Sequence, residues 1–406
     1  MANKKNTPVA AGEAPKPKPP AGRKRGAGKA AVAPAPAEAG APLSMSAAIE
    51  GESPAPALPT RKRGRPAKAT QTTPESAAAP VPAAADAVPI DQEVGESVPT
   101  VPAEKKLEKD LVKRPAGSLQ SSLRVFQIYF ENWQRELLDP NFAALDNSKS
   151  TSELYEFDVF LRLAQSDYVK GAELWGALSW RFTEKTGMSG QDLVKFIEAH
   201  PGHDVYYCNP VPENEALYHN LWLQGETSHP QFLALMQAIF KVTGLPLEEL
   251  VSIQASDTLS SANYFVATPK FWSAYLPWVQ TVLSLANKKL PAQIRDLLHS
   301  PQADDRGLHG GATYVPFVIE RLFPIFMKTQ GKSLKGCKVP LPERERELNV
   351  HLKLLCEMKD VAHRTKSAWL AACWVNYRNL YLTQVRGKEW CTKYLRAITP
   401  TDIRFG

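Results

Sequence analysis

The sequence predicts an α/β domain built on a mixed sheet flanked by helices, with a disordered basic arm before it and a helical appendix after it. The first aromatic residue is Phe126, whereas 19 of the 34 prolines precede it. Aromatic side chains supply the largest apolar areas that a core can bury, so residues 1–117 are expected to stay disordered. Beyond them, strand-like runs alternate with single helical patterns, which favours an α/β sandwich over 118–341. The helix-rich end, 342–406, is interpreted as the appendix.

The elements follow one another in a strand-and-helix order. Runs dense in β-branched and aromatic residues predict strands, and apolar residues at helical spacing predict helices. The expected strands are 123–130, 175–182, 204–208 and 263–267, with a loop at 139–147. The expected helices are 153–163, one capped by Ser189, 217–223, 231–242, 269–286 and most of the chain from Pro316 onward.

Charge divides the chain in the same way as aromatic content. The arm has 18 Lys and Arg against 12 Asp and Glu, which leaves about +1 of the net charge of +7 for the domain. No apolar run reaches the roughly 18 residues of a membrane span, and the first residues lack the apolar region of a signal peptide. We therefore expect a cytoplasmic protein. Five widely spaced cysteines without a Cys-x-x-Cys pair indicate neither a disulfide framework nor a zinc site.

One segment of the arm resembles an AT-hook. It reads Arg61-Lys62-Arg63-Gly64-Arg65-Pro66-Ala67-Lys68. Gly64 permits close backbone approach, Pro66 sets an extended path, and Arg63 and Arg65 fit the narrow minor groove of A·T-rich DNA. Lys62 and Lys68 would then contact phosphates.

Two other interpretations of the arm stay open. A second cluster at 22–29 has similar charge but lacks the Arg-Pro half, so it predicts only non-specific phosphate contact. Lysines interleaved with alanine and proline also suit a solubilising tail or a segment that binds polyanions in general, including polyphosphate.

Several motifs of the domain, taken in order over about 123–326, resemble bacterial glycosyltransferase-like proteins of polysaccharide biosynthesis. The motifs are Asp146-Asn147; 175–182 with Lys185-Thr186-Gly187; His203-Asp204-Val205-Tyr206 leading into Asn209-Pro210; Gln224-Gly225-Glu226 with His229-Pro230; Asn263-Tyr264-Phe265-Val266 with Phe271-Trp272; and Glu320-Arg321. The resemblance implies a GT-A-type fold that binds a nucleotide sugar and acts on a glycan acceptor.

The chain departs from GT-A enzymes at the metal site. Those enzymes commonly place Asp-x-Asp at a strand end to hold Mn²⁺ or Mg²⁺ against the donor diphosphate, and this chain has no Asp-x-Asp. The pair Asp304-Asp305 lies in a Gly-rich loop, and Asp204 precedes its strand. Asn209 is the nearest positional counterpart, able to orient a sugar hydroxyl but a poor magnesium ligand.

Glycosyl transfer requires a pocket for base and ribose, positive charge or a metal for the leaving diphosphate, and a carboxylate to accept the acceptor proton. The candidates for these roles are, respectively, Asp146 and Asn147; Arg181 and Lys185; and Glu226 or Glu320. Asn263 and Tyr264 fit a wall of the binding site.

Each candidate also has a structural interpretation. Arg and Glu on helices are usually solvated and paired, Asn263 suits a turn, and most tryptophans belong in the core. His203 and His229 are interpreted as surface histidines because no third metal ligand follows at a useful spacing.

Two hypotheses from different classes follow. The first is a glycosyltransferase-like enzyme acting on a bacterial surface or intracellular glycan, tethered to DNA or another polyanion by its arm. The second is a non-enzymatic, nucleoid-associated DNA-binding protein. The ordered motifs favour the first, whereas the AT-hook-like arm and the missing Asp-x-Asp favour the second.

Overall fold

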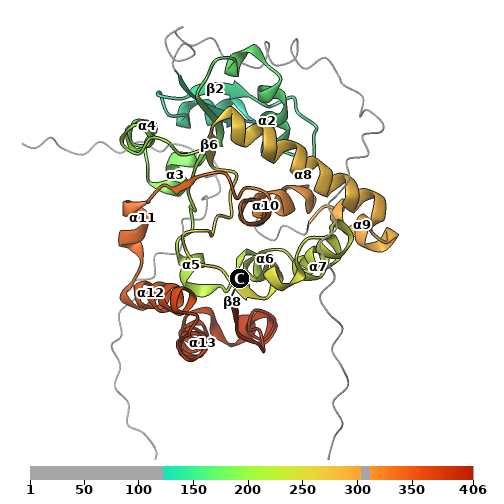
Figure 1. Ribbon diagram of the computed structural model, residues 1–406, viewed down its shortest axis with the longest axis vertical. Helices are drawn as coiled ribbons and strands as arrows, with labels where there is room; N and C mark the ends of the chain where they lie inside the picture. The colour runs from blue at the N-terminus through green and yellow to red at the C-terminus, as the bar shows by residue number, and fades with distance from the viewer. Residues whose placement is uncertain (1–121, 303–310, 406) are drawn as a thin grey trace, which may run out of the picture. The chain divides into compact units, whose positions relative to one another are not determined.

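The computed structural model describes residues 122–302 and 311–405, and these form a mixed α/β fold (Figure 1). The predicted AT-hook segment 61–68 and the pair Asp304-Asp305 lie outside the described residues. A six-stranded sheet has the order β2-β1-β3-β6-β4-β7. The prediction of a mixed sheet flanked by helices is confirmed.

All strands of this sheet except β6 run in the same direction. β1 pairs in parallel with β2 and β3, β6 pairs antiparallel with β3 and β4, and β4 pairs in parallel with β7. The strands are β1 (Leu123–Tyr129), β2 (Ala143–Asp146), β3 (Leu174–Ser179), β4 (Val205–Tyr207), β6 (Phe265–Ala267) and β7 (Gly336–Lys338). The carboxyl ends of five strands therefore meet at one edge of the sheet.

Three sequence predictions about this sheet were wrong. β2 lies inside the expected loop 139–147, and β7 lies in the part expected to be mainly helical. The strand expected to reach residue 182 ends at Ser179, because Phe182 already begins α3 (Phe182–Thr186).

Helices cover both faces of the sheet (Figure 1). One face packs against α2, α7, α8 and α10, and the other against α3 and α4. Their bounds are α2 (Glu156–Ala164), α4 (Gly190–Ala199), α7 (Phe232–Thr243), α8 (Pro269–Lys289), α9 (Ala292–Leu298) and α10 (Val315–Thr329). Within the described residues, no helix combines the length and apolarity needed to cross a bilayer.

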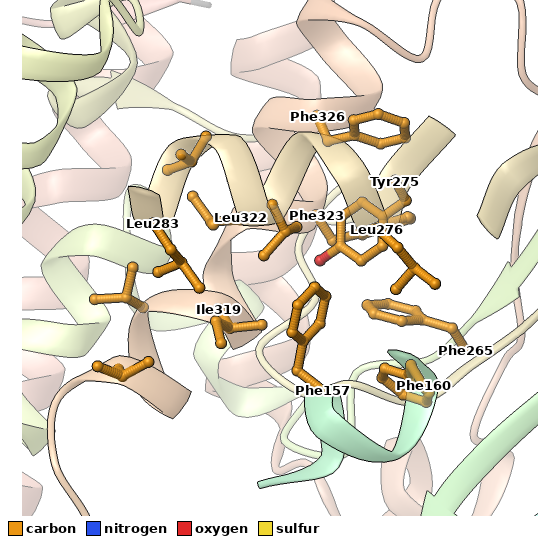
Figure 2. Packing of buried hydrophobic residues seen from close by; sticks show 14 of the residues in the cluster. Phe157, Phe160, Phe265, Tyr275, Leu276, Leu283, Ile319, Leu322, Phe323 and Phe326 are labelled. Atoms are coloured by element: carbon orange, nitrogen blue, oxygen red, sulfur yellow. The ribbon is translucent and has the colours of Figure 1, made fainter. Parts of the chain in front are cut away.

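Aromatic side chains join these helices to the sheet. Phe265 of β6 contacts Tyr275 of α8 and Phe323 of α10, with ring centroids 5.9 and 4.7 Å apart (Figure 2). Phe157 and Phe160 bring α2 into the same cluster. Each such side chain contributes about 1.5–3 kcal/mol through burial.

The segment predicted as one helix at 217–223 is interrupted. α5 (Glu213–Leu217) ends at the residue where the predicted helix was to begin, and α6 (Leu221–Ser228) begins after Asn220. The Asn220 side-chain oxygen accepts from Leu223 N at 2.9 Å, and its amide donates to Leu250 O and Ser252 O. A buried N-cap of this kind starts a new helix.

The C-terminal helices are fixed to the domain through the end of α5. Lys359 donates to Tyr218 O at 3.1 Å, Trp374 Nε1 to Ala216 O at 3.0 Å, and Arg378 to Leu217 O at 3.3 Å. The last carbonyls of a helix have no partner within it, so these donors satisfy groups that would otherwise be buried unpaired. The region comprises α11 (Pro342–Glu347), α12 (Val350–Thr365) and α13 (Ala368–Trp390), and its last strand, β8 (Arg404–Phe405), pairs with β5 (Ser252–Ile253).

Gly176 is where β3 and β6 approach most closely, and it provides the first prediction. A Cβ at Gly176 would lie 2.1 Å from the Phe265 carbonyl oxygen. We expect Gly176→Ala to lower the free energy of unfolding by about 3 kcal/mol or more, measured by urea denaturation. The control is Gly171→Ala, where φ is +74° but no atom lies within 4 Å, with an expected cost of about 1–2 kcal/mol. Equal losses would contradict the close approach.

The docking of α13 gives the second prediction. Trp374→Phe removes the donor to Ala216 O and leaves a buried carbonyl unpaired, so we expect a loss of about 2 kcal/mol in the free energy of unfolding. Trp369→Phe on the same helix, where the side chain is 85% exposed, is expected to change stability by less than about 0.5 kcal/mol. Thermal and urea denaturation measure the stability of both variants. A Trp374→Phe variant as stable as the wild type would mean that this contact does not hold the helix.

Candidate functional site

The carboxyl edge of the sheet gathers the residues that the sequence marked for substrate binding. Asp146 ends β2 and Asn147 follows it, Arg181 and Lys185 follow β3, Asn209 follows β4, and Asn263 and Tyr264 precede the antiparallel β6. The chain passes from β1 outward to β2 and then returns to the other side of β1 at β3. In open α/β sheets, ligands bind outside the carboxyl ends of the strands at such a reversal.

Asp146 and Asn147 are both held by local contacts. The Asp146 carboxylate accepts from Ser148 N at 2.9 Å. Burial opposes ionisation of Asp146, but hydrogen bonds from Ser148 and Tyr129 and the charge of Lys149 keep its pKa below the usual value. Asn147 is buried and accepts from Arg162 at 2.5 Å, while its amide nitrogen has no protein partner among the described residues.

Arg181 and Lys185 differ in their availability for an anion. Arg181 forms two hydrogen bonds to Glu184, at 2.5 and 2.8 Å, so its charge is already paired. Lys185 makes no ion pair within the described part of the chain. Burial raises the pKa of both Glu156 and Glu320, and the charge of Lys185 offsets a small part of each rise. Of the two cations that the sequence predicted for the diphosphate, Lys185 is therefore the one that can turn to a ligand.

Glu320 carries an unusual carboxyl group. Its side chain keeps 26% of its surface exposed, yet burial raises its pKa to about 7, and the nearby Glu156 adds to the shift. The neighbouring Arg321, 3.8 Å away, offsets this only in part. A carboxyl group with a pKa near neutrality has the proton affinity that suits a general base or acid.

Glu156 is a functional candidate that sequence reasoning missed. It begins α2, and burial raises its pKa. Tyr155 just before it has φ 50° and ψ −122°, a conformation that is strained for a bulky residue. Such strain is often found at functional sites. An acidic residue in the first turn of a helix is so common that nothing in the sequence singles out Glu156.

The remaining predicted residues have structural contacts. The Glu226 carboxylate accepts from Leu233 N at 2.8 Å and so caps the start of α7. Tyr264 is buried and its hydroxyl lies 2.9 Å from that of Ser179. The Asn263 side-chain oxygen is buried without a protein partner in the described chain.

The expectation that His229 lies at the surface was wrong. It is buried against Phe317, with ring centroids 4.0 Å apart, and its Nδ1 lies 2.6 Å from the Gln302 side-chain oxygen. His203 is half-buried beside Tyr206. The described residues contain no group of three or more His, Cys, Asp or Glu placed to hold a metal ion.

A cavity of about 800 Å³ lies next to the β4 and β7 end of the same edge. Its wall includes Glu215 of α5, which accepts from Asn209 at 2.8 Å and from Lys338 at 2.6 Å. The other side is formed by α11 and α12, including Cys356 and Asp360. The volume is in the range of ligand pockets. This cavity could not be predicted from the sequence, because its walls come from segments that are far apart in the chain, such as α5 and α12.

In comparisons with known proteins, no family model matches the chain, and neither a curated protein nor a solved structure matches it.

The raised pKa of Glu320 gives the third prediction. Between the usual carboxyl pKa and about 7, the folded state holds a proton that the unfolded state has lost, so stability falls as pH rises through this window. Glu320→Gln keeps the shape without the charge, and we expect it to be more stable than the wild type at pH 8 by roughly 1–3 kcal/mol and about equal at pH 4.

Urea denaturation at both pH values measures this difference. Glu198→Gln is the control, because Glu198 is exposed on α4. A Glu320→Gln curve parallel to the wild-type curve over the whole pH range would contradict the shift.

Proposed function

We propose that the folded domain is a glycosyltransferase-like protein that binds a nucleotide sugar at the carboxyl edge of its sheet and transfers the glycosyl group to a glycan. One observation carries this proposal: the ends of β2, β3 and β4 that bear the predicted residues lie on one edge of the sheet, and this edge includes the reversal of strand order. The motif resemblance selected these residues, and their shared edge supports the proposal.

The charges at this edge support a division of roles. Lys185 is the cation available to the leaving diphosphate, because Arg181 is paired with Glu184. Glu320 is the proposed base, since its pKa of about 7 lets it accept the proton of an acceptor hydroxyl near neutral pH. Glu226 is not proposed further as the base, because its carboxylate caps α7.

The arm keeps the role that its sequence predicts. Arg61 to Lys68 and the choice between an AT-hook and a general polyanion tether stay predictions, because this segment lies outside the described residues. The non-enzymatic alternative makes no use of Lys185, Glu156 and Glu320, whereas the proposed function assigns a role to Lys185 and to Glu320.

The fourth prediction tests the site in the full chain. We expect nucleoside diphosphate sugars to raise the melting temperature and to bind measurably in isothermal titration calorimetry. Lys185→Ala should weaken this binding about tenfold, because it removes the free cation, whereas Lys170→Ala, whose side chain is 82% exposed and pairs only with Asp167, should leave it unchanged.

Glu320→Gln separates binding from chemistry. It should bind the nucleotide sugar at least as tightly as the wild type but release the nucleoside diphosphate at least 100-fold more slowly in the presence of acceptor glycans. If no nucleotide sugar binds the wild-type protein, or if the two lysine variants behave alike, the proposed function is wrong.

A further inference from the structure

An exposed indole lies at the point where the strand order reverses. Trp133 is 54% exposed and belongs to the short 3-10 helix η2 (Asn132–Leu137), which directly follows β1. Tryptophan has a large apolar area, so an exposed one beside a candidate site calls for a reason.

Trp133 is held in a defined orientation. Its Nε1 donates to the Glu131 carboxylate at 2.6 Å. Glu131 and Gln134 also form a capping box at the start of η2, which fixes the helix that carries the indole. Because the only polar atom of the ring is already used, the group that Trp133 can offer to a ligand is its aromatic face.

A second indole supports the first from the other side of the reversal. Trp180 directly follows β3, and its ring meets Trp133 edge-on, with centroids 5.1 Å apart and planes at 77°. Trp180 packs against Tyr129 and Leu138. The two rings therefore come from the loops after β1 and β3, the two strands between which the chain reverses.

Buried Gln127 fixes the backbone of both loops. Its amide donates to Ser179 O and Trp180 O, each at 3.3 Å, and its side-chain oxygen accepts from Asp139 N at 2.7 Å. One side chain from the middle of β1 thus ties the end of β3 to the segment that follows η2. A surface built this way keeps its shape before any ligand arrives, which lowers the entropic cost of binding.

We infer that Trp133, supported by Trp180, is a stacking platform for the base of the nucleoside diphosphate moiety. This inference rests on the proposed function and names the part of the ligand that lies over β1 and β3. A base has two flat aromatic faces, and every base stacks on an aromatic side chain, so the platform supplies affinity without choosing among bases. The neighbouring Asp146 and Asn147, at the end of β2, are placed to read polar groups of the base or ribose.

The charged residues around the platform indicate in which direction the diphosphate of the ligand would extend from the base. Lys185 lies in α3, the helix that follows Trp180, and its backbone carbonyl accepts from Arg344 of α11, the helix after the edge strand β7, on the opposite side of β3 from β1. A base over β1 and β3 would therefore direct its diphosphate toward Lys185. The guanidinium of Arg181 lies 5.7 Å from the Trp180 ring centroid, so Trp180 is itself covered by a cation. The face that remains for the ligand is the one that Trp133 presents.

The test measures binding of uridine diphosphate, guanosine diphosphate and inorganic pyrophosphate to the full chain by isothermal titration calorimetry. Trp133→Ala should weaken the binding of both nucleotides roughly tenfold and leave pyrophosphate binding unchanged. Trp133→Phe keeps an aromatic face, so its affinity for the nucleotides should stay within about threefold of the wild type. Trp369→Ala, which removes an 85% exposed tryptophan from α13, is the matched control and should change nothing.

The outcomes separate the two proposals. Nucleotides that bind the wild type and Trp133→Ala equally well overturn the platform but leave the proposed function standing. The assignment to the base is also overturned if Trp133→Ala weakens only the binding of free acceptor sugars, or if it weakens pyrophosphate binding as much as nucleotide binding. If neither nucleotide nor any nucleotide sugar binds the wild type, both proposals fail. Melting curves of each variant establish that the exposed substitutions leave the fold intact.

Discussion

The contact between β3 and β6 at Gly176 is the constraint on which the rest of the structure depends. β6 runs against its neighbours, and it lies between the parallel strands β1, β2 and β3 and the parallel pair β4 and β7. Two parallel groups of strands separated by one antiparallel strand point the same way, so their carboxyl ends share an edge. A side chain at position 176 would push β6 away and separate the two groups. The candidate site therefore depends on the absence of a side chain at Gly176.

α5 makes the second essential connection, between the sheet and the C-terminal helices. At its beginning, Glu215 binds Asn209 after β4 and Lys338 at the end of β7. At its end, three successive carbonyls accept from side chains of α12 and α13. Two of these donors, Lys359 and Arg378, are buried cations whose pKa values are lowered by burial. Their attachment to a helix C-terminus compensates for part of the desolvation cost.

The sequence predicted the long elements, and it failed where an element is short. β2 and β7 have four and three residues, too few for a pattern to emerge, and β2 follows a turn-like Asp-Pro-Asn segment. Asp146, Asn209 and Tyr264 were predicted from the motifs that contain them, and in the structure they lie next to the ends of β2, β4 and β6. Their convergence follows from strand order, which no single segment encodes.

Trp133 escaped notice for a similar reason. Tryptophan in a sequence usually indicates core, and only the structure shows that this one lies on a turn with its face outward. The cavity beside Glu215 depends on contacts between α5 and a helix more than 100 residues later. Pairwise contacts over such distances are set by packing, which a linear pattern does not contain.

The two carboxyl groups near Lys185 connect the stability of the domain to its proposed chemistry. Burial raises the pKa of both Glu156 and Glu320, the charge of Glu156 adds to the rise at Glu320, and Lys185 opposes the rise at both, together with Arg321 at Glu320. A diphosphate drawn to Lys185 would add negative charge beside these carboxyl groups and weaken the opposing effect of Lys185, so proton uptake and anion binding would favour each other by the same factor. Departure of the diphosphate would then return Lys185 to the carboxylates and ease release of the proton. In the proposed reaction, the group that accepts the proton from the acceptor is therefore reset by the loss of the product that Lys185 holds.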